Sequence, residues 1–285
     1  MESSIHRFVP QLRFELLGPL SVKYSDVDIT PSAPKLRTLL CLLLINSNRV
    51  VTVSTLLDGL WEGEAPSSAR NTLQTYVFQL RKLFERALGV SSAYISDKLL
   101  ITYSGGYLLR VRPDQFDVFE FERLVAMGSS ALAEGQHGRA AMHLTRALDL
   151  WRGPMTFEGA QSDHVRASLN RLEERRFFAL IQRIEADLCR GLHQELVSEL
   201  SSLVIEYPLE ESVHAMSMVA LHRSGRTPGA LGVFRQLDSR MKEELGIEPS
   251  SRLQALHRAL LSADPQLSEP RHRLGTLLDS LAITW

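Results

Sequence analysis

The segment from Ser68 to Arg86, SARNTLQTYVFQLRKLFER, constrains the fold more than any other part of this chain. Its apolar side chains recur at intervals of three and four residues, which is the spacing of one buried face of an α-helix. These side chains are Leu73, Val77, Leu80 and Phe84, flanked by Tyr76 and Leu83. Such a face has to pack against a hydrophobic core, so the sequence predicts a helix that is buried on one side and exposed on the other.

The opposite side of this predicted helix carries side chains that suit DNA. Amides can pair bidentately with adenine edges, a hydroxyl can serve several bases, Lys can bind guanine, and an aromatic ring can lie against a thymine methyl group. An ordinary solvated helix would carry many alternating Glu and Lys residues, whereas Glu85 is the single acid here. We therefore expect five side chains to face the bases of a major groove: Asn71, Gln74, Thr75, Phe78 and Lys82.

Five basic residues are candidates for contacts with the phosphate backbone, which position a protein on DNA without carrying sequence information. They are Arg70, Arg81, Arg86, Lys35 and Arg37. A plain solvated charge is the alternative for each of them. For Phe78, the alternative is packing against another part of the fold.

Size and charge fit a DNA-binding protein with a second domain. The chain has 285 residues with 44% hydrophobic and 23% charged content, which is typical of a globular protein with room for two cores. Residues 1–112 hold 13 Lys and Arg against 9 Asp and Glu, a net charge of +4, and the remainder carries −5. A basic first part suits contact with nucleic acid.

The sequence predicts a cytoplasmic, nucleoid-associated protein without a membrane partner. The longest apolar run, residues 39–45, is too short to cross a bilayer, and the N-terminus lacks a secretory pattern. Cys41 and Cys189 are expected to be two buried thiols. The nine histidines form no ligand motif, and no GxxxxGK[ST] loop is present, so we expect no metal and no nucleotide or other cofactor.

The first 112 residues mix strand and helix patterns. Alternation predicts strands, and helical spacing predicts helices, in the order of a winged helix-turn-helix: three helices followed by a hairpin with a turn at Ser104-Gly105-Gly106. The predicted helices cover residues 32–46, 52–61 and 68–86, and the predicted strands cover residues 12–16, 20–24, 94–96, 99–103 and 107–111.

From residue 117 onward the strand patterns stop and helical spacing dominates. Helix-opening turns at Gly191 and Gly225 lie 34 residues apart, which is the period of tetratricopeptide hairpins. We expect helices over residues 117–134, 136–151, 162–190, 193–207, 209–224, 227–245, 250–262 and, in the tail, 274–281. The predicted fold is an α+β winged helix-turn-helix domain (1–112), an all-α, tetratricopeptide-like domain (113–265) and a tail (266–285).

Short motifs in a fixed order carry a family resemblance. They are FELLGPLSV at 14–22, LRTLLCLLLINSNRVV at 36–51, LLDGLW at 56–61, PSSARNTLQTYVFQLRKLF at 66–84, GGYLLRV at 105–111, FERL at 121–124, ALDLWRGP at 147–154, RIEADL at 183–188, ELVSEL at 195–200, HRSGR at 222–226 and EELGIEPS at 243–250. The ordered set resembles the short form of the antibiotic regulatory protein (SARP) family of transcriptional activators, with an OmpR-type winged helix and a bacterial transcriptional activator domain.

The resemblance implies a regulator that binds direct repeats in double-stranded promoter DNA as a homodimer. It also implies recruitment of RNA polymerase, through sigma and other subunits, to genes of a secondary-metabolite cluster. By the same resemblance, the loop after the second helix is a candidate polymerase contact through Glu62, Gly63 and Glu64; a spacer that sets the helix angle is the alternative. The turn at residues 103–106 departs from many winged-helix relatives because it lacks a basic residue, which puts anchoring of the wing to phosphate in doubt.

Two other classes of function are open to test. A helical-repeat adaptor for protein–protein interaction would have no need for amides and cations on the helix at 68–86. An enzyme would need a nucleophile with a base, or a metal, and the sequence contains no motif for either. The helical domain could in addition bind a small-molecule effector.

Overall fold

A computed structural model describes residues 12–61, 64–155, 163–268, 275 and 277–280, in two compact units. The first unit contains the chain up to Leu124 together with Ala147–Arg176, and the second contains Val125–Arg146 and the chain from Phe177. Helices α5 (Asp117–Ala133), α6 (His137–Leu148) and α7 (Asp163–Cys189) contribute residues to both units. The two units are defined by which residues pack together, not by whether those residues form strands or helices. The domain boundary at residue 112 stays a prediction.

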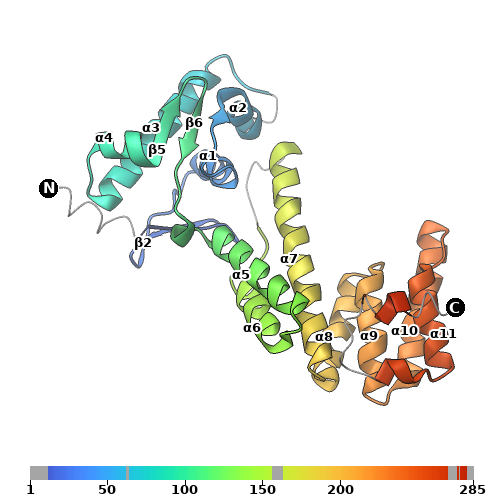
Figure 1. Ribbon diagram of the computed structural model, residues 1–285. Helices are drawn as coiled ribbons and strands as arrows, with labels where there is room; N and C mark the ends of the chain where they lie inside the picture. The colour runs from blue at the N-terminus through green and yellow to red at the C-terminus, as the bar shows by residue number, and fades with distance from the viewer. Residues whose placement is uncertain (1–11, 62–63, 156–162, 269–274, 276, 281–285) are drawn as a thin grey trace. The chain divides into compact units, whose positions relative to one another are not determined.

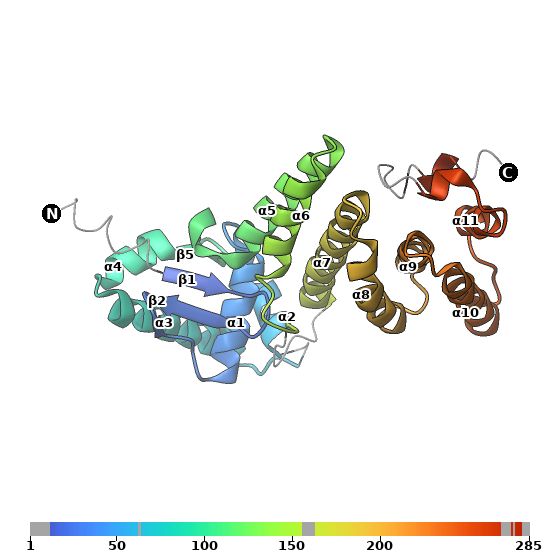
Figure 2. The same ribbon diagram turned by 90° about the horizontal axis from the view of Figure 1, so that it is seen from below.

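The first unit opens with a small antiparallel sheet in the order β1-β2-β3. Its strands are β1 (Leu12–Glu15), β2 (Ser21–Tyr24) and β3 (Val27–Asp28). Leu12 and Phe14 are buried while Arg13 is exposed. The alternating apolar and polar residues that predicted β1 therefore face the core and the solvent in turn. Figure 2 shows β1 and β2 running beside α1 and α3.

Three helices follow, as predicted. They are α1 (Pro34–Ile45), α2 (Val53–Trp61) and α3 (Ala69–Leu88). Pro34 occupies the first turn of α1, where its missing N–H costs no helical hydrogen bond. The apolar face of α3 is buried, and Phe84 meets Phe14 of β1 edge to face with ring centroids 6.1 Å apart. The apolar side chains of α3 thus pack against the sheet and complete the hydrophobic core of the first unit.

A second sheet, in the order β4-β6-β5, carries the hairpin that we call the wing (residues 100–109). Its strands are β4 (Val51–Thr52), β5 (Leu100–Tyr103) and β6 (Gly106–Leu109), and Figure 1 shows β5 and β6 beside α3. Gly105 has φ 86°, which favours glycine. A Cβ atom on Gly106 would lie 2.3 Å from the backbone oxygen of Val51, so glycine is required for β4 and β6 to pair.

The strand predicted at residues 94–96 is wrong. The chain forms a short helix, α4 (Ser92–Tyr94), that continues as a π-helical turn over Ile95–Leu99. The Ser91 hydroxyl accepts a hydrogen bond from the Tyr94 N–H and caps this turn. Ile95 and Leu99 are buried from helical positions, and an apolar run this short does not distinguish strand from helix by periodicity.

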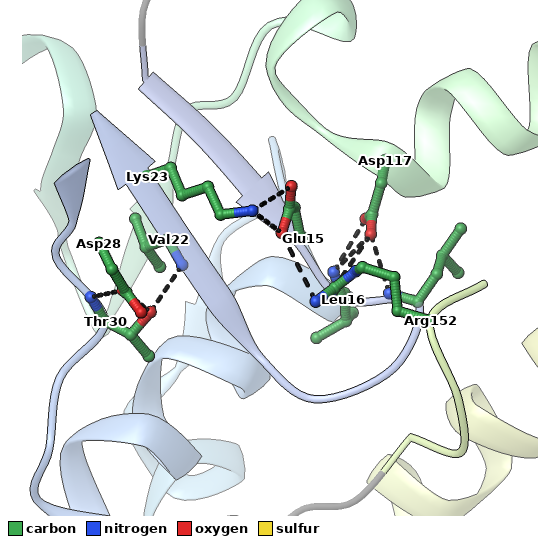
Figure 3. Close-up of polar contacts among 9 residues, drawn as sticks. Glu15, Leu16, Val22, Lys23, Asp28, Thr30, Asp117 and Arg152 are labelled. Atoms are coloured by element: carbon green, nitrogen blue, oxygen red, sulfur yellow. Dashed lines mark hydrogen bonds and ion pairs between the residues drawn. The ribbon is translucent and has the colours of Figure 1, made fainter. Parts of the chain in front are cut away.

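A buried carboxylate ties the start of α5 to the end of β1 (Figure 3). Asp117 accepts hydrogen bonds from the Leu16 N–H at 2.8 and 2.9 Å and from the Leu17 N–H at 2.9 Å. Arg152 joins the same cluster: its N–H donates to the Leu17 carbonyl, and its guanidinium lies 3.5 Å from Glu15 and 3.9 Å from Asp117. These contacts connect three segments that are far apart in the sequence.

The second unit is helical, and its helices begin and end within three residues of the predicted bounds. They include most of α6 (His137–Leu148) and the whole of α8 (His193–Glu206), α9 (Glu211–Arg223), α10 (Thr227–Leu245) and α11 (Ser251–Leu261), followed by a 3-10 turn over Pro265–Ser268. Helix α9 is buried from Val213 to Leu221 because it packs against α8, α10 and α11 (Figure 1). The tetratricopeptide likeness stays a prediction.

Three further expectations concern absences and the tail. In the described ranges, no helix is long and apolar enough to span a bilayer, and no cluster of His, Cys, Asp and Glu could hold a metal ion. Cys41 and Cys189 are buried free thiols, as predicted. Residues 275 and 277–280 are helical, while the rest of the predicted tail helix lies outside the described residues.

Candidate nucleic-acid interface

The face of α3 opposite its buried stripe is exposed. Asn71, Gln74, Thr75 and Phe78 are exposed, and the Lys82 side chain is 38% exposed. Phe78 is 57% exposed, so most of its surface is not covered by the wing or by another helix, which was the alternative for this residue. We call these five residues the α3 face. The helix brings all of them to one side because their spacing follows its 3.6-residue period.

The α3 face has its own internal contacts. Lys82 Nζ lies 2.8 Å from Glu85 Oε2 and 5.7 Å from the centroid of the Phe78 ring. The Thr75 hydroxyl donates to the Asn71 carbonyl oxygen of the preceding turn. A part-exposed ion pair of this kind contributes little stability, so Lys82 can exchange Glu85 for a DNA acceptor at small cost.

Neighbouring elements fix the direction of α3. The Trp61 ring at the end of α2 stacks on Tyr76 of α3 with centroids 6.3 Å apart and planes 12° from parallel. Trp61 therefore acts as part of the support of α3. Lys35 Nζ donates to the Leu60 carbonyl oxygen at 2.5 Å, so this candidate for phosphate contact is also a cap on the C-terminal end of α2.

The five candidates for phosphate contact differ in their surroundings. Arg70 and Arg86 are exposed at the two ends of α3, and Arg37 of α1 is half-buried. Arg81 is half-buried, and its guanidinium donates to the Leu100 carbonyl oxygen and to the Thr102 hydroxyl of the wing. Burial lowers the pKa of Arg81, although an arginine remains charged at neutral pH.

The candidates for polymerase contact lie between α2 and α3. Glu62 and Gly63 lie outside the described residues. Glu64 is exposed, and its N–H donates to the Trp61 carbonyl oxygen at 2.9 Å, which extends the end of α2. Both interpretations of this loop, a polymerase contact and a spacer, stay open.

Sequence reasoning missed two features of this surface. The first is the attachment of Arg81 to the wing, because a basic residue at the margin of an exposed face has no signature of an internal partner. The second is Tyr103, which ends β5 at the wing turn with 44% of its surface exposed. The wing thus presents an aromatic and a hydroxyl group, Tyr103 and Ser104, where a basic residue would give a phosphate contact.

Comparison with known proteins gives two family matches that together cover both parts of the chain. Residues 29–109 match the family "Transcriptional regulatory protein, C terminal", and residues 116–261 match the "Bacterial transcriptional activator domain". The first match contains α1 to α3 and the wing. The second contains most of the helical part.

Individual relatives align over nearly the whole chain. Regulatory protein DnrI of Streptomyces peucetius is 42% identical over 254 residues, which cover 89% of this chain and 93% of DnrI. Regulatory protein AfsR of Streptomyces coelicolor is 34% identical over 90% of this chain, which spans 25% of AfsR. The solved structure of Mycobacterium tuberculosis EmbR in complex with a low-affinity phosphopeptide is similar with a TM-score of 0.84 and 30% identity, over 96% of this chain and 69% of EmbR.

Proposed function

This chain belongs to the SARP family of transcriptional activators, and on that basis we propose that the α3 face reads the bases of direct repeats in promoter DNA. One observation carries the proposal: amide, hydroxyl, aromatic and cationic groups are exposed on the same side of a helix whose other side is buried. Such a helix can enter a major groove while the core holds it in place.

Each group on the α3 face has a chemical role in this proposal. Asn71 and Gln74 pair with the hydrogen-bonding edges of bases, Phe78 lies against an apolar group such as a thymine methyl, and Lys82 binds guanine or an adjoining phosphate. Arg70 and Arg86 lie at the two ends of the helix, where they can hold the phosphates that flank the groove. Specificity then comes from the middle of α3 and affinity from its ends.

Activation needs a second contact, and we assign it to RNA polymerase. The helical unit and the loop that includes Glu64 are the surfaces proposed for this contact, and the helical unit is also proposed to pair two chains on adjacent repeats. The family resemblance supports these assignments and the choice of a secondary-metabolite gene cluster as target. It also supports a cytoplasmic protein associated with the nucleoid.

The test of base reading is loss of specific affinity on removal of one amide. Asn71→Ala and Gln74→Ala should each weaken binding to the cognate repeat by about 1–3 kcal/mol, because a bidentate hydrogen bond between a side-chain amide and a base contributes about that much. Binding to unrelated duplex DNA should stay nearly unchanged. An electrophoretic mobility titration with both DNAs at one fixed salt concentration measures the two affinities.

Gln194→Ala provides the matched control, since Gln194 is an exposed amide on helix α8 of the other unit. It should leave both affinities unchanged on DNA that carries a single repeat, where pairing of two chains does not contribute to binding. If the α3 variants bind the cognate repeat as tightly as the original chain, the base contacts are absent. If the original chain does not bind promoter DNA even at low salt, the adaptor function takes precedence.

A further inference from the structure

Arg81 differs from the exposed basic residues of α3 in what its guanidinium contacts. Nε and Nη2 donate to the Leu100 carbonyl oxygen at 3.0 and 2.7 Å, and Nη2 also donates to the Thr102 hydroxyl at 2.8 Å. Both acceptors belong to β5, which is an edge strand because its sheet runs β4-β6-β5. The guanidinium of Arg81 is therefore hydrogen-bonded to a backbone oxygen and a side-chain oxygen of the wing.

The contact is placed where it fixes the wing relative to α3. Strand β5 pairs with β6 through Leu100–Leu109 and Thr102–Tyr107, so Leu100 and Thr102 are two paired positions of the hairpin. The wing turn lies directly beyond them, at residues 103–106. A planar guanidinium that donates to two positions along one strand restricts the tilt of that strand, which a single ammonium group on Lys cannot do in the same way.

We propose that Arg81 is a positioning residue that sets the wing at the angle at which the wing and the α3 face contact one DNA duplex together. The inference rests on the proposed function, since it assumes that α3 enters the major groove and that the wing reaches the adjacent backbone or minor groove. It replaces the expected phosphate contact of Arg81 with a contact inside the protein. Arg86, which is exposed on the same helix, keeps the phosphate role.

The two roles predict different responses to salt. The logarithm of the DNA-binding constant falls linearly with the logarithm of the salt concentration, and loss of one phosphate contact makes this slope shallower by about 0.9. The wing turn is Tyr103-Ser104-Gly105-Gly106 and has no cation, so displacement of the wing weakens binding without changing the number of released counterions. A Lys in place of Arg81 would preserve a phosphate contact but not the bidentate attachment to Leu100.

The experiment compares Arg81→Ala and Arg81→Lys with Arg86→Ala in the full chain, on promoter DNA and in its absence. We expect both Arg81 variants to lose about tenfold in affinity and to keep the original salt slope. Hydroxyl-radical footprints should lose protection on the wing side of each repeat and keep it at the α3 site. General destabilisation would instead weaken both parts of the footprint together.

Hydrogen exchange of the free protein gives a readout that does not depend on DNA. Backbone amides of residues 100–109 should exchange faster in both Arg81 variants, while those of α9 keep their rates. Thr102→Val, which removes one acceptor and is a milder change, should weaken DNA binding less than Arg81→Lys and should not add to it.

Any one of three results would overturn the inference. They are DNA binding by Arg81→Lys as tight as that of the original chain, a salt slope that is shallower by about 0.9 in Arg81→Ala, and unchanged hydrogen exchange at residues 100–109 in the Arg81 variants. If the original chain does not bind promoter DNA, the proposed function fails. In that case the exchange rates still decide whether Arg81 holds the wing.

Discussion

At the residue scale, Asp117 is a buried carboxylate whose surroundings act in opposite directions. Burial raises its pKa to about 6 from 3.8, while the Leu16 and Leu17 N–H groups and Arg152 act to lower it. Desolvation is the largest of these effects. The folded state therefore holds a proton on Asp117 more tightly than the unfolded chain does.

A prediction of pH dependence follows from that difference. Stability from a raised carboxyl pKa is fully present below pH 3.8 and is lost as the pH rises to about 6. Because Asn does not titrate, the free energy of unfolding of the original chain minus that of Asp117→Asn should fall by about 3 kcal/mol over this interval and stay flat above it. Urea titrations at several pH values measure it. A difference that rises over the interval would mean that the N–H donors and Arg152 outweigh burial.

The α3 face shows how far residue roles follow from sequence. Helical spacing alone predicts that Asn71, Gln74, Thr75 and Phe78 share an exposed side, because spacing fixes direction on a helix. The partner of Arg81 lies nineteen residues away on β5 and depends on tertiary packing, so no local pattern could predict it. Which bases these residues contact stays a prediction.

At the element scale, the long helices follow from sequence and the shortest strands do not. The bounds of α3 and α10 come from apolar spacing over many residues, and that signal grows with length. Strands β3 and β4 have two residues each, which is too short for an alternating pattern to be visible. They exist because β2 and β6 offer them partners.

The wing sheet leads to a prediction at this scale. Gly106→Ala should destabilise the first unit by about 1–3 kcal/mol, since its Cβ would lie 2.3 Å from the Val51 oxygen and would separate β4 from β6. Denaturant unfolding followed by circular dichroism measures the loss. Promoter affinity should fall with it, because the wing and α3 are connected.

Gly232→Ala is the control for the Gly106 variant. Gly232 lies inside α10, and apart from the helix's own backbone no heavy atom of the described residues lies within 4 Å of the position that an alanine methyl group would take there. Alanine should therefore stabilise the second unit by up to about 1 kcal/mol. If Gly106→Ala proves as stable as the original chain, β4 and β6 can accommodate a methyl group at this position, and glycine is not required there.

At the scale of the whole molecule, the proposed homodimer makes the spacing of the repeats a measurable property. Two chains that pair on direct repeats must meet the same face of the duplex, and one turn of DNA takes about 10.5 base pairs. Inserting five base pairs between the repeats should therefore abolish cooperative binding, while inserting ten should restore part of it. Quantitative footprint titration of both DNAs measures cooperativity; equal binding to both would show that each chain binds alone.

DNA cleavage from α3 itself can show whether the α3 face enters the major groove. An iron chelate attached to Gln79→Cys, at the exposed edge of that face, should cut promoter DNA at a short cluster of positions within each repeat. Cys41 and Cys189 are buried, so labelling is confined to the introduced thiol. If α3 enters the major groove, cuts are expected at the repeats alone. Cleavage spread evenly along the fragment, under conditions where the labelled chain remains bound, would show that it does not.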